Sequence, residues 1–337
     1  MKSLRNSLGL FILGGAALFA QEAQLPAPAA PRPERPPRPG VSTPGVKRDI
    51  STLKPIAVFP AEGTPDWQVV TEDAVWVSNG PKNTVHRLDP KTNKVAEVIE
   101  VGKKPCSGLA AGFGSVWVPN CGDQTLSRID IKTNKVTATL PYGPAASEGG
   151  LVAGKDSVWM LTDGGKTLLR IDPETNKAVA DILMPPGSFV CVLGEDNAVW
   201  VVSTEKSQVV RVDPTTNLIT DRVNVGPKPR FTTVGAGAIW TLNQGDGTVS
   251  RIDVKTRKMI TNIALGIPGG GGEIAYGGNV VWVTVFEIPL SQIDVETNTV
   301  VKQWVGAGGD AVRFGHGSVW LSNLRAGNVW RIDPKQP

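Results

Sequence analysis

The chain has 337 residues, of which 40% are hydrophobic and 20% charged, a composition typical of a globular rather than a disordered protein. Its formal net charge of +4 is unevenly distributed along the sequence. The first 54 residues hold eight Lys and Arg and three Asp and Glu, whereas residues 55–337 hold 27 basic and 28 acidic residues. The larger part of the chain therefore lacks the basic excess of a nucleic-acid-binding domain. The only two His residues, His86 and His316, stand in unlike settings, so we expect neither a His-based metal site nor a His-dependent triad.

Residues 1–20 have the pattern of a secretory signal peptide. Lys2 and Arg5 give a basic start, an apolar stretch runs from Leu8 to Phe19, and Ala20 is a small residue at a plausible cleavage point. The apolar stretch is shorter than the roughly 20 residues that a spanning helix needs, although an uncleaved anchor is the alternative. We therefore expect a periplasmic or secreted protein with no membrane insertion after the signal is cleaved.

Residues 21–49 are expected to form a Pro-rich tether. Eight Pro residues lie between positions 26 and 44, separated mainly by Ala and Arg. Such a composition cannot bury a core and favours an extended, semi-rigid chain.

From about residue 50 the sequence repeats. A hydrophobic residue followed by Trp recurs every 38 to 42 residues, and an Asp follows each Trp after 12 or 13 residues. The Trp positions are 76, 117, 159, 200, 240, 282 and 320, and the Asp positions are 89, 130, 172, 213, 253, 294 and 333. A period near 40 with four short strands per unit is typical of a β-propeller. We therefore predict an all-β fold for residues 50–337, a seven-bladed β-propeller with four-stranded antiparallel blades.

The second repeat shows how one blade is expected to be built. Its strands are predicted at residues 107–112, 115–120, 125–130 and 136–140. An Asp-x-x-Thr-Asn turn joins the third strand to the fourth, because Asp accepts backbone N–H bonds and Asn tolerates the left-handed conformation. We interpret the repeated Asp and Trp as structural, with each Trp ring packed between neighbouring blades.

The ring is expected to close with an N-terminal strand. The seventh repeat ends one strand short, and residues 55–59 resemble the fourth-strand segments 95–101 and 300–305. This N-terminal strand should pair into the last blade and remove an exposed sheet edge.

The repeats diverge most at one end of the predicted channel, where the first strand of each blade starts and the second strand ends. The first-strand positions are Asp66, Cys106, Glu148, Phe189, Arg230, Glu273 and Asp310; the second-strand positions are Asn79, Asn120, Thr162, Ser203, Asn243, Val285 and Asn323. Trp67, Phe231, Phe286 and Arg313 lie next to them, and a Gly-rich run, residues 268–272, precedes Glu273.

This end of the channel is the candidate site. We take Asp66, Trp67, Asn79, Asn120, Glu148, Phe189, Arg230, Asn243, Glu273, Asp310 and Asn323 as its candidate ligand-binding rim. Carboxylates, amides, Arg and aromatic rings suit a small polar ligand, or a divalent cation held by oxygen atoms. The alternative is a solvated rim that binds nothing.

The three cysteines divide into a pair and a single thiol. Cys106 starts the first strand of a blade and Cys121 follows the second strand of the same blade. Because those ends are neighbours in an antiparallel pair, we expect a disulfide, which an exported protein can keep. Cys191 should be a free core thiol.

The repeats resemble a known family. The segments Val116-Trp117-Val118-Pro119-Asn120 and Arg170-Ile171-Asp172-Pro173-Glu174-Thr175-Asn176-Lys177 are similar to the YVTN-type repeats of exported bacterial seven-bladed propellers, a superfamily that includes the streptogramin B lyases. The resemblance covers roughly residues 55–335. It implies catalytic His and Glu side chains at first-strand starts and a bound Mg²⁺.

The lyase residues do not carry over to this sequence. The matching first-strand starts hold Asp66, Cys106 and Arg230 in place of His, and Glu273 is followed two residues later by Ala275. We assign no catalytic residue from the resemblance.

We therefore expect a non-enzymatic, exported binding or scaffold module that takes a small polar ligand or a protein partner and needs no cofactor. The alternative is a metal-assisted lyase or lactonase with a cation on Asp66, Glu148, Glu273 and Asp310.

Overall fold

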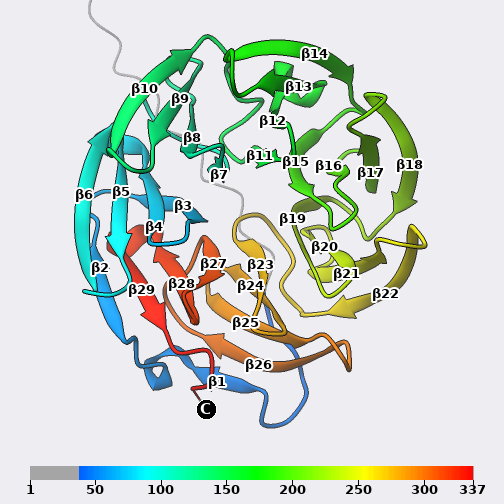
Figure 1. Cartoon of the computed structure of the whole chain (residues 1–337). Coiled ribbons are helices and arrows are strands. Elements are labelled where there is room, and N and C mark those ends of the chain that lie inside the picture. Colours follow the sequence, from blue (N-terminus) through cyan, green and yellow to red (C-terminus); the bar gives the residue numbers. More distant parts are fainter. Residues whose placement is uncertain (1–37, 337) are drawn as a thin grey trace, which may run out of the picture. The chain divides into compact units, whose positions relative to one another are not determined.

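The computed structural model describes residues 38–336, which form seven β-sheets arranged around a central channel (Figure 1). The predicted signal peptide and most of the predicted tether lie outside the described residues. In each sheet the strands run antiparallel and follow chain order from the channel outward, except that N-terminal strands form the outer edges of two of the sheets. This arrangement confirms the predicted seven-bladed propeller. Among residues 38–336, no helix is long and apolar enough to cross a membrane.

The first four blades are each formed by four consecutive strands. Blade 1 contains β3 (Pro65–Val70), β4 (Val75–Asn79), β5 (Thr84–Asp89) and β6 (Lys94–Glu100). Blade 2 contains β7 (Ala110–Gly112), β8 (Ser115–Asn120), β9 (Thr125–Asp130) and β10 (Lys135–Leu140). Blade 3 contains β11 (Leu151–Gly154), β12 (Ser157–Thr162), β13 (Thr167–Asp172) and β14 (Lys177–Leu183). Blade 4 contains β15 (Ser188–Leu193), β16 (Val199–Ser203), β17 (Gln208–Asp213) and β18 (Leu218–Asn224).

The remaining blades include the N-terminal strands. Blade 5 contains β19 (Pro229–Gly235), β20 (Ala238–Asn243), β21 (Thr248–Asp253) and β22 (Lys258–Ala264). Blade 6 contains β23 (Glu273–Gly277), β24 (Val280–Val285), β25 (Ile288–Asp294), β26 (Thr299–Val305) and β1 (Lys47–Asp49). Blade 7 contains β27 (Val312–Gly315), β28 (Ser318–Asn323), β29 (Asn328–Ile332) and β2 (Ala57–Pro60). Single-turn 3₁₀ helices lie at Ile50–Thr52, Gly80–Lys82, Asp163–Gly165 and Leu324–Ala326.

The closing strand lies where the sequence predicted it. β2 pairs antiparallel with β29, with Ala57 opposite Arg331 and Pro60 opposite Asn328. In Figure 1 the blue β2 therefore runs along the outside of the red β29. The first and last parts of the propeller share one sheet, so blade 7 cannot be completed without the N-terminal strand.

One strand was not expected. β1 lies in the segment predicted as tether, yet it adds a fifth, parallel strand to the outer edge of β26, with Lys47 opposite Gln303. The Gln303 side chain also accepts from the Val41 N–H at 2.8 Å. The chain is therefore attached to blade 6 before the propeller begins.

The first strand of blade 2 is shorter than predicted. Residues 107–109 are not in a strand, because Ser107 has a left-handed φ of 68°. Its N–H donates to the Ser147 carbonyl at 2.8 Å, and the Gly108 N–H donates to Gly149 at 3.0 Å. This segment is therefore tied to the loop before blade 3 instead of to its own blade.

The repeated Trp and Asp residues are structural, as predicted. All seven Trp side chains are at most 1% exposed. In blade 2, the Arg128 guanidinium stacks 4.7 Å from the Trp117 ring and donates to Pro173 and Asn176 in the turn of blade 3. The same arrangement joins Arg170 to the turn of blade 4. Arg251 and Arg331 make the same contacts from blades 5 and 7. Four Trp–Arg stacks therefore fasten one blade to the turn of the next, whereas Arg87 of blade 1 pairs with Asp73 of its own blade.

Candidate functional site

The structure brings together four carboxyl groups from blades 1, 3, 6 and 7, which we call the carboxylate mouth: Asp66, Glu148, Glu273 and Asp310. Asp66 lies on β3 and Glu273 begins β23, whereas Glu148 and Asp310 lie in the loops before β11 and β27. Asp310, Glu148 and Glu273 all repel a negative charge on Asp66. The convergence of these four residues, inferred from repeat alignment, is therefore present in the fold.

Glu273 is the most fixed of the four. Its side chain is buried, ion-pairs with Arg313 and accepts from the Val312 N–H at 3.0 Å. Burial raises the pKa of Glu273, and the Arg313 and Val312 contacts oppose that rise. The Glu273 N–H donates to the Thr284 hydroxyl at 2.8 Å, and that hydroxyl donates to the Asp310 carbonyl. Thr284 therefore holds two members of the mouth in register.

Asp66 and Asp310 form a hydrogen-bonded carboxyl pair. Burial is the largest cause that raises the pKa of Asp66 well above its usual value, followed by repulsion from Asp310. Burial also raises the pKa of Asp310, to about 6, against the opposing hydrogen bonds from Asp66 and the Gly272 N–H. Ionising two adjacent carboxyl groups is unfavourable because their negative charges repel. Asp66 therefore keeps its proton and donates a hydrogen bond to the carboxylate of Asp310.

Glu148 faces Arg230 across the mouth. Burial and repulsion from Asp310 raise the pKa of Glu148 to about 7, and attraction to Arg230 opposes the rise. The Arg230 guanidinium lies 4.4 Å from the centre of the Phe189 ring. Phe189 thus supports the arginine that faces Glu148, and both side chains remain in the candidate site.

The four Asn residues of the predicted rim are not part of this surface. Asn79, Asn120, Asn243 and Asn323 are between 0 and 3% exposed. Asn120, for example, donates to Thr125 at 3.0 Å and to Ser127 at 2.9 Å inside its own blade. Asn323 accepts from the Gly309 N–H at 2.9 Å. A buried amide that already has partners is not presented to a ligand, so we remove these four residues from the candidate site.

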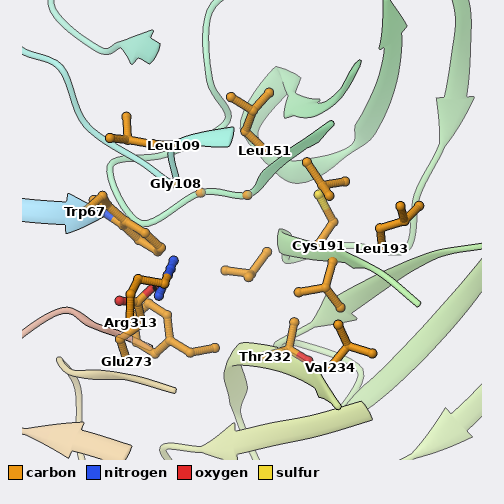
Figure 2. A pocket seen from close by; sticks show the side chains of 16 residues that line it. Trp67, Gly108, Leu109, Leu151, Cys191, Leu193, Thr232, Val234, Glu273 and Arg313 are labelled. Atoms are coloured by element: carbon orange, nitrogen blue, oxygen red, sulfur yellow. Dashed lines mark ion pairs between the residues drawn. The ribbon is translucent and has the colours of Figure 1, made fainter. Parts of the chain in front are cut away.

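Trp67 lies in the channel rather than on the rim. It is 4% exposed, and its ring centre is 6.0 Å from that of Phe231 on the opposite side of the ring of blades. Together with Glu273 and Arg313 they line a cavity of about 240 Å³ (Figure 2). Most of its other lining residues are Val, Leu and Gly, and they include the free thiol of Cys191. Burial raises the pKa of Cys191 to about 12, so this thiol is unreactive.

The Gly-rich run before Glu273 is fastened by a residue that the sequence did not single out. The buried Arg38 side chain donates to the carbonyls of Pro268, Gly270 and Phe286 and forms an ion pair with Glu287 at 2.9 Å. In the same loop, the Gly272 N–H donates a hydrogen bond to the Asp310 carboxylate. Arg38 lies in a Pro-rich segment without periodicity, so no sequence signal distinguished it from its neighbours.

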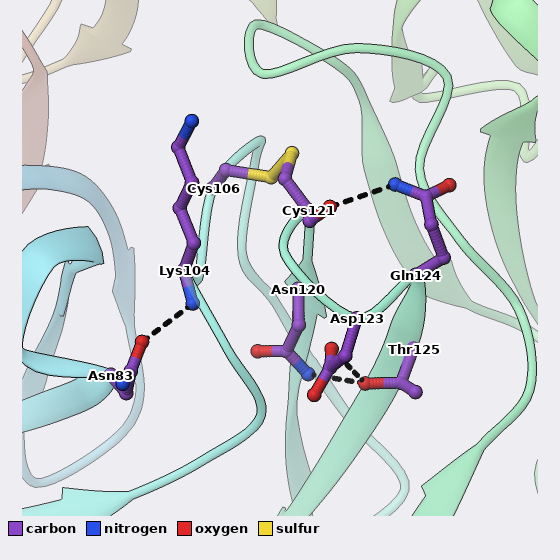
Figure 3. The surroundings of a disulfide bond; sticks show 8 residues. All are labelled: Asn83, Lys104, Cys106, Asn120, Cys121, Asp123, Gln124 and Thr125. Carbon is purple, nitrogen blue, oxygen red and sulfur yellow. Dashed lines mark hydrogen bonds between the residues drawn. A yellow bond between two sulfur atoms is a disulfide. The ribbon is translucent and has the colours of Figure 1, made fainter. Parts of the chain in front are cut away.

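A disulfide joins Cys106 to Cys121, as predicted (Figure 3). The two Cα atoms are 5.9 Å apart. Cys106 also lines a cavity of about 410 Å³ together with Asp66, Lys104 and Ser147. The cross-link therefore fixes the loop that forms one wall beside Asp66.

The carboxylate mouth does not have the geometry of a metal site. Among residues 38–336, no group of three or more His, Cys, Asp and Glu side chains is placed so that it could hold a metal ion. The Asp66–Asp310 pair is held by a proton, and Glu273 is held by Arg313.

In sequence comparisons, no protein-family model and no curated protein matches the chain. Solved structures do match. A streptogramin B lyase superposes with a TM-score of 0.69 at 20% identity and covers 81% of this chain and 93% of its own. A catalytically inactive virginiamycin B lyase from Staphylococcus aureus, solved with quinupristin, gives 0.72 at 17% identity, covering 83% and 98%. Kuenenia stuttgartiensis hydrazine synthase gives 0.65 at 15% identity, covering 88% and 99%. The fold is therefore a streptogramin B lyase-like seven-bladed β-propeller.

Proposed function

We propose that this protein is an exported binding module that takes a small polar ligand with a cationic group, such as an ammonium, at the carboxylate mouth. The observation that carries the proposal is the convergence of four carboxyl groups from four blades on one mouth, where burial raises the pKa of each. Arg230, Arg313 and Arg325 each act on one carboxyl group of this cluster, but they do not offset burial and mutual repulsion.

A cationic ligand would supply the missing positive charge. The carboxyl groups that hold protons in the free protein can release them to solvent when an ammonium group binds, because an opposite charge within about 4–6 Å favours the ionised form. Hydrogen bonds to charged groups contribute roughly 1.5–3 kcal/mol each. An organic cation also suits the mouth better than a divalent metal ion, since no three of its acids are arranged as metal ligands.

The proposal predicts a definite pH dependence. Glu148 and Asp310 ionise as the pH rises through about 7 and about 6. A cationic ligand should therefore bind more tightly at pH 8 than at pH 5, whereas a neutral ligand of the same shape should not show this change.

A thermal-shift and calorimetric screen tests the idea with a charged and a neutral probe of the same shape, for example Nα-acetyl-lysinamide against Nα-acetyl-norleucinamide, at pH 5 and pH 8, since the lysine ammonium keeps its charge at both pH values. We expect stabilisation by the cationic member of a pair at pH 8 and its loss in Asp310→Asn. Glu100→Gln changes an exposed acid on β6 and serves as the control. Equal affinity for charged and neutral members, or binding that Asp310→Asn leaves unchanged, would contradict the proposal.

A second candidate function is a lyase or lactonase. It is favoured by the similarity in fold to virginiamycin B lyase and by Glu148, whose pKa of about 7 suits a general base. Mass spectrometry of quinupristin incubated with the protein, with and without Mg²⁺, separates the two functions. Conversion that Glu148→Gln abolishes would replace the binding module with an enzyme.

Export is the remaining part of the proposal. The mature protein should begin at Gln21, directly after the predicted signal peptide, and N-terminal sequencing of protein recovered outside the cytoplasm tests this. Retention of Met1 in that fraction would contradict it.

A further inference from the structure

The central channel holds an apolar cavity directly inside the carboxylate mouth (Figure 2). The cavity has a volume of about 240 Å³ and is lined by the first strands of all seven blades and by the loops that lead into them. In four blades the lining begins one residue after a member of the candidate rim: Trp67 follows Asp66, Gly149 follows Glu148, Val190 follows Phe189 and Phe231 follows Arg230. Glu273 belongs to both the mouth and the lining. A ligand held at the mouth therefore lies next to this cavity.

The lining of the channel suits an aromatic ring. The rings of Trp67 and Phe231 pack against each other, with their centres 6.0 Å apart and their planes tilted by 52°. Both residues line the cavity, and so does Cys191. Aromatic rings and sulfur atoms pack favourably against a further ring. A dry apolar cavity of about 150 Å³ is enough to bind benzene, so the channel has room for a ring and a short alkyl chain.

The charged groups of the lining add no net charge to the channel. Its acidic residue, Glu273, and its basic residue, Arg313, form an ion pair with each other. The Thr232 hydroxyl donates to a main-chain carbonyl of its own blade at 2.9 Å. An ammonium group inside the cavity would therefore lack partners, and burying an unpaired charge is unfavourable. The mouth offers this group the carboxyls of Glu148 and Asp310, so the charged end of a ligand should stay at the mouth while its apolar part enters the channel.

We infer that the ligand of the carboxylate mouth is an arylalkylammonium ion, with its ammonium group at Glu148 and Asp310 and its ring in the channel beside Trp67 and Phe231. The inference rests on the proposed function and specifies the apolar part of the cationic ligand proposed there. A short alkyl linker is sufficient, because Trp67 and Gly149 directly follow residues of the mouth. Burial of a phenyl ring in the channel should tighten binding about tenfold or more.

The probes are 2-phenylethylammonium, ethylammonium as the cation without a ring, and 2-phenylethanol as the neutral molecule of nearly the same shape. Binding is measured by calorimetry and saturation-transfer NMR on the full chain at pH 8, where both amines are charged. We expect a Kd on the order of 1 mM or tighter for 2-phenylethylammonium. Ethylammonium should bind about tenfold or more weakly, because it leaves the channel unfilled. 2-Phenylethanol should also bind more weakly, because it lacks the charge.

Two variants separate the channel from the mouth. Val192→Phe enlarges a half-buried lining residue on β15 and should reduce the affinity for 2-phenylethylammonium to that for ethylammonium, whose own binding should not change. Asp310→Asn should weaken both cations. Val179→Phe makes the same change at an exposed position on β14 and is the control, which should bind all three probes like the wild type. The comparison of the three probes on the wild type keeps the test decisive if Val192→Phe fails to fold.

The inference is overturned if ethylammonium binds within about threefold of 2-phenylethylammonium, if 2-phenylethylammonium does not bind at roughly ten times the expected Kd, or if a folded Val192→Phe binds it unchanged. In each of these cases the proposed function still stands if Nα-acetyl-lysinamide binds at pH 8 and Asp310→Asn weakens it. Equal affinity for 2-phenylethanol and 2-phenylethylammonium would instead show that charge adds nothing at the mouth, and would overturn both.

Discussion

The carboxylate mouth should make the protein less stable as the pH rises, and Glu148→Gln should remove much of that loss. The pKa of Glu148 rises from 4.5 to about 7 on folding. Below pH 4.5 the carboxyl is protonated in both states and costs nothing. Between these values the unfolded chain ionises while the folded protein holds its proton, so stability falls; above pH 7 the full penalty applies.

The size of the effect follows from the same values. A rise in pKa from 4.5 to about 7 corresponds to about 3 kcal/mol of folding free energy at pH 8. Glutamine has nearly the same shape and no charge, so Glu148→Gln should raise the free energy of unfolding by up to that amount at pH 8. At pH 4 it should change stability by less than about 0.5 kcal/mol.

Urea unfolding of the wild type and the variant at pH 4 and pH 8 measures this difference, with Glu100→Gln as the exposed control. We expect the gain to be confined to pH 8 and absent from the control. An equal gain at both pH values would mean that the variant acts through packing. A loss of stability at pH 8 would refute the reading of the mouth as a site of uncompensated negative charge.

Four further outcomes are expected. Deleting the chain up to residue 49 removes β1 and the Arg38 contacts but leaves the ring closed, so it should lower the melting temperature less than deleting it up to residue 60, which also removes β2 and reopens the ring; equal melting temperatures would contradict closure by β2. Thiol titration of denatured, unreduced protein should find one free thiol, Cys191, and reduction of the disulfide, which spans 15 residues, should cost roughly 3 kcal/mol. Trp200→Ala should lower the free energy of unfolding by roughly 3–5 kcal/mol, and a loss below about 1 kcal/mol would mean that the blades collapse around the cavity. Arg38→Ala should speed amide exchange at residues 269–272, and unchanged exchange there would show that this loop is ordered without Arg38.

The frame of this protein could be predicted from sequence because its demands repeat. Each blade needs a large aromatic ring packed against its neighbour and a tight turn at its outer edge. Trp117 and Asp130 therefore have counterparts in all six of the other repeats. Because the same packing contact occurs in every blade, the same residue type recurs in every repeat. The position of that residue within each repeat predicts which strand it belongs to, and so the order of the strands. The closing strand was visible for the same reason, since β2 has the pattern of a fourth strand.

The candidate site was predictable only in part. Alignment of the repeats placed Asp66, Glu148, Glu273 and Asp310 at the same level of the ring, and the fold brings them together. The same alignment placed Asn120 and its equivalents beside them, because an amide at a strand end has the same sequence pattern whether it faces solvent or a neighbouring loop. Burial and hydrogen bonding, which distinguish the two cases, depend on the loop packed above each strand.

The sequence by itself determined the number of blades, their order and the ring closure, since these follow from short-range patterns that recur in every repeat. Only the tertiary structure decided which acid keeps a proton, since the pKa of Asp66 depends on Asp310 from another blade, far away in the chain. It also decided that Arg38 holds the Gly-rich loop. Those features arise from single, unrepeated contacts between distant segments, and a contact that occurs once leaves no periodic trace in the sequence.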